Sequence, residues 1–209
     1  MTLDLAGTGA RLRATTGVQR VPSPSLELFI VKRFLGAEQC APLIALIDAN
    51  RRPSTIADDI GEVAFRTSET CDLDGAHQEV ASVDAAICAL LGLPRELGEP
   101  IQGQRYAPGQ EFKPHTDTFE PMGPDYFEHC AERGNRSWTA MCYLNEPESG
   151  GATRFKAIDK IVQPETGKLL AWNNLLPDGR PNPVTLHQGM RVRKGTKYIL
   201  TKWFRERPA

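Results

Sequence analysis

The second half of the chain constrains the fold most strongly, because it consists of short apolar runs separated by turn signals. From residue 99 onward, strand-length runs alternate with the turn-forming clusters PGQ, ESGG, PETG, PDG and RKGT. Runs of this length and spacing indicate an antiparallel sandwich or barrel. The segment 123–134, GPDYFEHCAERG, interrupts this pattern, and we expect a short helix or an ordered loop there.

Helical signals are concentrated in the first half. Residues 26–35, LELFIVKRFL, have the apolar density and β-branched content of a strand. Apolar residues at helical spacing follow in 36–52 and again in 77–94. Gly92 and Pro94 are expected to end the second helix.

These patterns predict a simple domain organisation. Residues 1–20 show no periodicity, and we expect them to form a loose, flexible leader. The remainder, 21–209, is predicted to form a single α+β domain, with helical support at about 36–94 and a β-rich core at about 99–207.

Bulk properties narrow the function classes. The net charge is −1, so the whole chain has no electrostatic footprint for nucleic acid. No apolar run approaches the ~20 residues of a membrane span, and the N-terminus lacks the apolar segment of a signal peptide. We therefore expect a cytoplasmic protein without membrane partners. No CxxC pair occurs, so a disulfide framework or thiolate zinc site is not indicated among the five cysteines, Cys40, Cys71, Cys88, Cys130 and Cys142.

A histidine and an aspartate stand one residue apart in KPHTDTFEP. On an extended segment the side chains of His115 and Asp117 point to the same side, so both could bind one metal ion. His187, at the end of NPVTLH in the β-rich half, is the best third ligand among the histidines. Two histidines and a carboxylate form the facial triad of non-haem iron(II) oxygenases, but a zinc hydrolase can use the same set. The pair alone is also compatible with two surface polar residues.

A lysine near the C-terminus bears on these alternatives. In GTKYILTKWF, one face of a strand would hold Lys197, Ile199, Thr201 and Trp203. If this face is inward, the ammonium of Lys197 needs a counter-charge. A dianionic small molecule such as 2-oxoglutarate, which chelates iron at one end and presents a free carboxylate at the other, would supply it. In the opposite register, Lys197 faces solvent.

Several motifs, taken in order, resemble the prolyl 4-hydroxylase branch of the Fe(II)/2-oxoglutarate-dependent dioxygenases. They are QRYAPGQEFKPHTD, GNRSWTAMCYLNEPESGGATRF, VQPETGKLLAWNN and LHQGMRVRKGTKYILTKWFRER, preceded by FRTSETCDL at 65–73. The ordered match covers residues 104–207. The resemblance implies a double-stranded β-helix, a jelly-roll and cupin-like fold, with N-terminal supporting helices.

The resemblance also assigns roles by position. It implies that His115, Asp117 and His187 are the catalytic iron ligands. Lys197 matches the lysine that pairs with the distal carboxylate of 2-oxoglutarate, and Tyr106 matches the tyrosine that lines the same pocket.

Four further residues are candidates of lower specificity. Thr139 matches a threonine near the cosubstrate, and Trp203 is either a wall of the pocket or a plain core tryptophan. Arg66 is a candidate substrate contact or a structural arginine, and Arg154 stands where relatives often have an apolar residue, at a position that could border the substrate.

The basic residues near the C-terminus are expected on a solvated face: Arg191, Arg193, Lys194, Lys202, Arg205 and Arg207.

The implied activity is hydroxylation of a C–H bond of a prolyl residue in a peptide or protein, with release of succinate and CO₂. The implied cofactors are Fe(II), 2-oxoglutarate and O₂, and the resemblance allows for ascorbate. Asp117 favours hydroxylation, because related halogenases lack this carboxylate. Two alternatives stay open: a hydroxylase of a free amino acid or other small molecule, and a non-catalytic cupin-like module that binds a metal or ligand. The sequence carries no prediction of oligomeric state.

Overall fold

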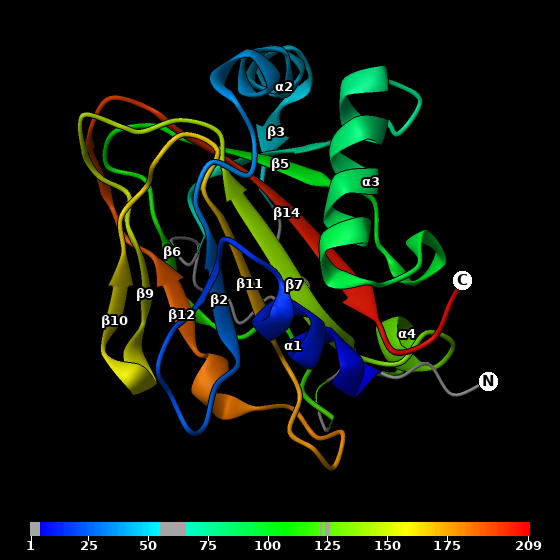
Figure 1. The fold of residues 1–209 in the computed structure, drawn as a ribbon. Helices are drawn as coiled ribbons and strands as arrows, with labels where there is room; N and C mark the ends of the chain where they lie inside the picture. Colours follow the sequence, from blue (N-terminus) through cyan, green and yellow to red (C-terminus); the bar gives the residue numbers. More distant parts are fainter. Residues whose placement is uncertain (1–4, 55–65, 122, 124–125) are drawn as a thin grey trace.

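A large antiparallel sheet forms the centre of the protein (Figure 1), which is described by a computed structural model over residues 5–54, 66–121, 123 and 126–209. Within these residues the sheet has eight strands. In spatial order they are β1 (Val18–Arg20), β2 (Leu28–Val31), β11 (Leu169–Asn173), β7 (Arg136–Tyr143), β14 (Lys197–Arg205), β5 (Gln102–Tyr106), β4 (Glu69–Asp72) and β3 (Arg52–Pro53).

A smaller antiparallel sheet lies against one face of the large one. Its four strands, among the residues described, are in spatial order β10 (Lys160–Val162), β9 (Thr153–Phe155), β12 (His187–Gly189) and β6 (Phe112–His115). A further short pair joins β8 (Ser149–Gly150) to β13 (Val192–Lys194). One of two hydrophobic clusters fills the space between the sheets, where Tyr143 and Ile199 of the large sheet meet Phe155 of the small one.

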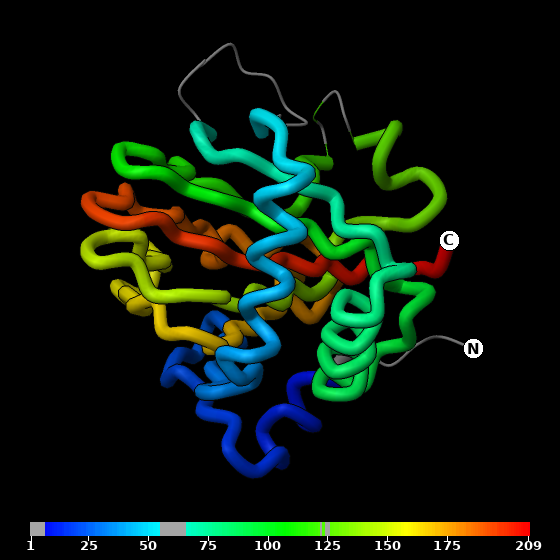
Figure 2. The backbone as a smooth tube through the Cα atoms, turned by 90° about the horizontal axis from the view of Figure 1, so that it is seen from above, coloured from blue at the N-terminus to red at the C-terminus, as the bar shows by residue number. Residues whose placement is uncertain are grey.

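Helices cover the other face of the large sheet. The longer ones are α2 (Ala37–Asn50) and α3 (Gln78–Leu91), and Figure 2 shows α2 crossing the strands. Leu43 and Ile47 of α2 join the second hydrophobic cluster with Leu200 and Phe204 of β14. The remaining helical segments are α1 (Leu5–Ala14), α4 (Tyr126–Cys130), and the 3₁₀ turns η1 (Arg95–Leu97), η2 (Lys156–Ile158) and η3 (Pro183–Thr185).

The predicted elements of the first half are confirmed. The two apolar periodicities correspond to α2 and α3, and the apolar run at 26–35 contains β2. Gly92 ends α3 in a left-handed conformation with φ of 70°, and its N–H donates to Cys88 O. Such a conformation favours glycine because other residues meet a steric penalty from Cβ. The described part of 123–134 contains the short helix α4, and the α+β class is as predicted.

The prediction of a loose leader over 1–20 is wrong for residues 5–20. They form helix α1 and strand β1, which pairs with β2. Leu12 is fully buried, and the guanidinium of Arg11 donates to the carbonyls of Ala89 and Leu90 at the end of α3. Contacts with α3 and the core stabilise this helix, and a sequence without a clear apolar stripe does not reveal such contacts.

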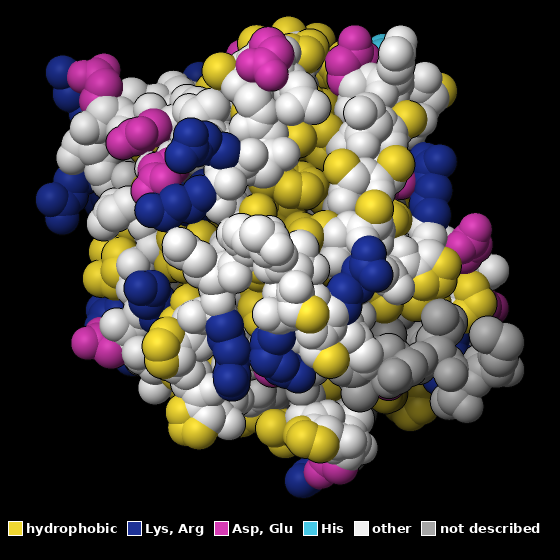
Figure 3. Space-filling view, in the orientation of Figure 1, with side chains coloured by type: hydrophobic (Ala, Val, Ile, Leu, Met, Phe, Trp, Pro, Cys, Tyr) yellow, Lys and Arg dark blue, Asp and Glu magenta, His cyan; other side chains and the backbone are white. Residues whose placement is uncertain are grey.

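The described residues include no helix whose length and apolar character would suit a membrane span. Basic and acidic side chains are intermixed on the face shown in Figure 3, in keeping with the net charge of −1.

The prediction of a solvated basic face is wrong for Lys202 and Arg205, which are buried. All nine residues of β14 are buried, and alternate side chains point to opposite faces of the sheet. Lys202 points toward the helices, where Nζ lies 2.5 Å from Asp84 Oδ1 of α3. Arg205 Nε lies 2.8 Å from Glu99 Oε1. Carboxylates distant in the sequence therefore allow these cations to be buried.

The ion pair between Asp84 and Lys202 predicts an asymmetric loss of stability. Removing one member of a buried pair costs about 3–5 kcal/mol, because the other charge stays buried without its partner. Asp84→Leu should cost more than Lys202→Met, since Asp84 also pairs with Arg95 at 2.7 Å. Urea unfolding measures both, and the double variant should be more stable than Asp84→Leu alone. Single variants within about 1 kcal/mol of the wild type would contradict this.

Candidate metal centre

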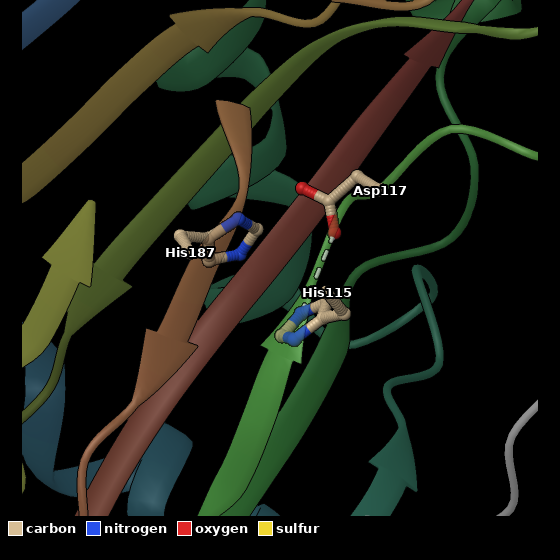
Figure 4. A group of neighbouring side chains, drawn as sticks. All are labelled: His115, Asp117 and His187. Carbon is tan, nitrogen blue, oxygen red and sulfur yellow. Dashed lines mark ion pairs between the residues drawn. The ribbon is translucent and has the colours of Figure 1, made fainter. Parts of the chain in front are cut away.

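Two strands of the smaller sheet bring the predicted metal ligands together. His187 of β12 pairs directly with His115 of β6, and Asp117 follows β6 by two residues. Figure 4 shows the three side chains pointing toward a common centre. Each offers one ligand atom, and these atoms all lie within 4.8 Å of one another. The arrangement can hold one metal ion.

Hydrogen bonds fix the orientation of both imidazoles. His115 Nδ1 lies 2.7 Å from Lys113 O, and His187 Nδ1 lies 2.9 Å from Thr185 O. A carbonyl only accepts, so each Nδ1 carries the hydrogen and each Nε2 presents a lone pair. A backbone carbonyl on the second ring nitrogen is the usual arrangement of metal-binding histidines.

The protonation states also suit a metal. Burial and the neighbouring His187 lower the pKa of His115 to about 3, so its imidazole is neutral near pH 7. Burial raises the pKa of Asp117, but the two histidines and a hydrogen bond from Thr139 outweigh it and place the pKa below its ordinary value. Asp117 Oδ1 lies 4.0 Å from His115 Nε2. Two imidazoles beside one carboxylate match the donor set that non-haem Fe(II) prefers.

Thr139 contacts the metal ligand and not the cavity. Its hydroxyl donates to Asp117 Oδ2 at 2.6 Å and accepts from Asn174 Nδ2 at 2.8 Å. Its predicted place near the cosubstrate stays a prediction, and the contact that the structure shows is with the carboxylate of Asp117. Asn174 received no role from the sequence, and its one signal is the asparagine two residues after the tryptophan in LLAWNN.

A cavity between the two sheets adjoins the ligands. It is lined by His115, Asp117 and His187 together with Tyr106, Lys197 and Trp203, among others. Lys197, Ile199, Thr201 and Trp203 all face it, so the inward register of β14 is the one observed. Trp203 walls the cavity, and the guanidinium of Arg136 lies 4.0 Å from its ring centre.

Lys197 is 1% exposed and has no carboxylate within ion-pair distance among the residues described. Its ammonium lies 4.8 Å from the ring centre of Tyr106, its cross-strand partner. Burial alone lowers the pKa of Lys197 to about 7. This end of the cavity therefore suits an anion, because a bound carboxylate would favour the charged form of Lys197.

The hydroxyl of Tyr106 is held by a residue that the sequence did not single out. It donates to Gln104 Oε1 at 2.7 Å, and Gln104 Nε2 donates to Thr201 Oγ1 at 3.2 Å. Gln104 faces the cavity because it is two residues from Tyr106 on β5. That alternation was available in the sequence, but the partner on β14 was not.

The two arginines proposed as substrate contacts differ in position. Arg66 lies beside the cavity, with its guanidinium 4.9 Å from the ring centre of Phe112 and Nη2 donating to Gln102 Oε1 at 2.8 Å. Neither arginine lines the cavity itself, and the substrate roles of both stay predictions. Thr153 and Phe155 of β9 are buried, and alternation turns Arg154 outward, where it pairs with Asp159 at 3.2 Å.

Comparison with known proteins places this centre in a family. A family model described as the 2OG-Fe(II) oxygenase superfamily matches residues 101–205. The chain belongs to this superfamily. Within it, the chain resembles the prolyl 4-hydroxylases, as the sequence predicted.

Three similar proteins illustrate this relationship. Prolyl 4-hydroxylase subunit alpha-1 of Gallus gallus is 33% identical over 144 residues, or 68% of this chain and 28% of that protein. Probable prolyl 4-hydroxylase 4 of Arabidopsis thaliana is 31% identical over 201 residues, covering 84% of this chain and 66% of that protein. The viral collagen prolyl hydroxylase of Paramecium Bursaria Chlorella virus-1, solved as a 2OG complex, has a TM-score of 0.66 at 26% identity and covers 85% of this chain and 95% of that chain. The chain thus spans little more than a quarter of the alpha-1 subunit.

The triad predicts a specific loss of metal. His187→Ala removes one of three ligands, so the protein should no longer retain Fe(II) after gel filtration under anaerobic conditions. His77→Ala is the matched control, because His77 is exposed at the start of α3. Metal analysis of both proteins checks the assignment, and full retention of Fe(II) by His187→Ala would refute it.

Proposed function

We propose that the protein is an Fe(II)- and 2-oxoglutarate-dependent dioxygenase that hydroxylates a prolyl residue in a peptide or protein. The observation that carries this proposal is the combination of two features in one cavity: the triad of His115, Asp117 and His187, and the buried ammonium of Lys197. A metal site alone is compatible with several activities. A metal site that shares a cavity with a lysine lacking a carboxylate partner among the described residues suits a chelating dianion.

In this proposal, one side of the cavity binds the metal and the other binds the cosubstrate. His115, Asp117 and His187 would hold Fe(II), which when bound supplies the activation of O₂ coupled to decarboxylation of the keto acid. Lys197 pairs with the distal carboxylate of 2-oxoglutarate, and Tyr106 orients the same end. The apolar and aromatic walls keep water away and strengthen these charge interactions. The products are succinate, CO₂ and the hydroxylated substrate.

We also infer that the two facing sheets form one double-stranded β-helix in a single catalytic domain. The metal ligands then lie at the open end of the smaller sheet, and the helices on the far face of the large sheet support it. The antiparallel order of both sheets and the likeness to the viral enzyme support this inference.

A peptide substrate is favoured by the surroundings of the ligands. A groove of about 470 Å³ borders Thr116, which lies between two ligands, and runs along Thr118, Glu120, Pro121, Leu176 and residues 180–183. An extended chain could lie along this surface while one residue enters the cavity. Of the two segments expected to grip a peptide, 118–134 contributes to the groove and 52–68 lies mostly outside the described residues. The relatives, which are prolyl hydroxylases by name, give no support to the small-molecule or non-catalytic alternatives.

Turnover with a peptide pool tests the proposal directly. Purified protein with Fe(II), 2-oxoglutarate and O₂ should produce succinate and a one-oxygen mass gain on proline. Oxygen gain on free amino acids only would favour the small-molecule alternative. Iron-loaded protein that forms no succinate with any substrate would point to a binding module.

The lowered pKa of Lys197 predicts a pH dependence of cosubstrate affinity. Above pH ~7 the free protein increasingly holds Lys197 neutral, so binding of the dianion must be accompanied by proton uptake. The KM for 2-oxoglutarate should therefore rise by about tenfold between pH ~7.5 and ~8.5, with kcat at saturation changing much less. In Lys197→Met the KM should be high at every pH. A KM that is flat over this range in the wild type would show that Lys197 stays charged without the ligand.

A further inference from the structure

A chain of two hydrogen bonds connects Asn174 to the metal ligand Asp117. Asn174 Nδ2 donates to Thr139 Oγ1 at 2.8 Å, and Thr139 Oγ1 donates to Asp117 Oδ2 at 2.6 Å. Asn174 and Thr139 are both fully buried, so water does not compete for these bonds. The backbone also fixes Asn174, whose N–H donates to Ser137 O and whose carbonyl accepts from the N–H of Asn182, each at 2.8 Å.

The chemistry of the three groups determines which atom donates in each of these two hydrogen bonds. An amide NH₂ can only donate, so the oxygen of Thr139 accepts from Asn174 and its single hydrogen is left for Asp117. If the amide were turned over, Asn174 Oδ1 and Asp117 Oδ2 would compete for that hydrogen. In the observed orientation, the hydroxyl hydrogen of Thr139 is therefore donated to the carboxylate of Asp117.

The two oxygens of Asp117 consequently have different surroundings. Oδ2 is occupied by the hydroxyl of Thr139, whereas Oδ1 lies 4.0 Å from His115 Nε2, on the side of the metal centre. A carboxylate held in this way presents one oxygen to a metal. Without the hydroxyl, the carboxylate could turn and offer both oxygens.

We propose that Asn174 is a positioning residue that acts through Thr139 to keep Asp117 a single-oxygen metal ligand. This inference rests on the proposed function, because three protein ligand atoms leave room on the metal for a chelating cosubstrate and O₂. A second oxygen from Asp117 would take one of these places. Asn174 thus contributes to open coordination positions although it contacts neither the metal nor the substrate.

The test measures metal binding and coordination without turnover. Co(II) replaces Fe(II) as an air-stable probe, and its visible spectrum reports the coordination number. Asn174→Leu and Thr139→Val should each weaken Co(II) binding about 10–100-fold, the usual effect of losing a group that orients a ligand, and should alter the spectrum. The double variant should bind no more weakly than Thr139→Val, because Asn174 acts only through that hydroxyl. Thr139→Ser, which keeps the hydroxyl, should bind like the wild type.

A neighbouring asparagine provides the matched control. The side chain of Asn173 donates to Glu27 Oε2 at 3.1 Å and, among the described hydrogen bonds, makes none with Thr139, so Asn173→Leu should leave Co(II) affinity and spectrum unchanged. Circular dichroism of the metal-free proteins checks folding, and Asn174→Ala replaces the leucine variant if the latter is unfolded.

The outcomes separate this inference from the proposed function. Wild-type affinity and spectrum in the folded Asn174 variants would overturn the positioning role and leave the proposed function standing. Losses that add in full in the double variant would overturn the route through Thr139. Wild-type protein that binds neither Co(II) nor Fe(II) would overturn the proposed function as well.

Discussion

The pairing of β12 with β6 is the constraint on which the metal centre depends. It sets His187 directly opposite His115, although the two are far apart in the chain. Side chains alternate along a strand, so a slip of one residue would turn His187 to the other face of its sheet. Asp117 then completes the triad because it follows the end of β6 by only two residues. The opposite edge of β12 pairs with β9, which fixes its register from both sides.

Strand β14 shows how one element can serve two purposes. Both of its faces are buried, and its two lysines lie on opposite faces. Lys202 faces the helices, where Asp84 balances its charge. Lys197 faces the cavity, where the described residues offer no such carboxylate. The stability of the sheet therefore does not require Lys197 to be paired, and its charge stays available for a ligand.

Local periodicity was enough to predict several elements and one face of the site. Apolar spacing located α2 and α3, and alternation along β14 placed Lys197 and Trp203 on one face, but it left open whether that face points inward or toward solvent. Ordered motifs then indicated the family.

Contacts between distant strands could not be predicted from local periodicity. The hydrogen bond from Asn174 to Thr139 depends on the adjacency of β11 and β7, and the outward position of Arg154 depends on which face of β9 is buried. Helix α1 was not predicted for the same reason, because it is stabilised by hydrogen bonds to α3, which is distant in the sequence.

Binding of 2-oxoglutarate with and without metal tests the central claim, that the triad and Lys197 form one site for a metal-chelated dianion. Anaerobic calorimetric titration of the Fe(II)-loaded and metal-free proteins makes the comparison without turnover. The account predicts one 2-oxoglutarate per chain for the loaded protein and an affinity at least about tenfold weaker without metal, since only the distal carboxylate would then be held. Equal affinity in the two forms would contradict it, because the metal and the lysine would then not share a ligand.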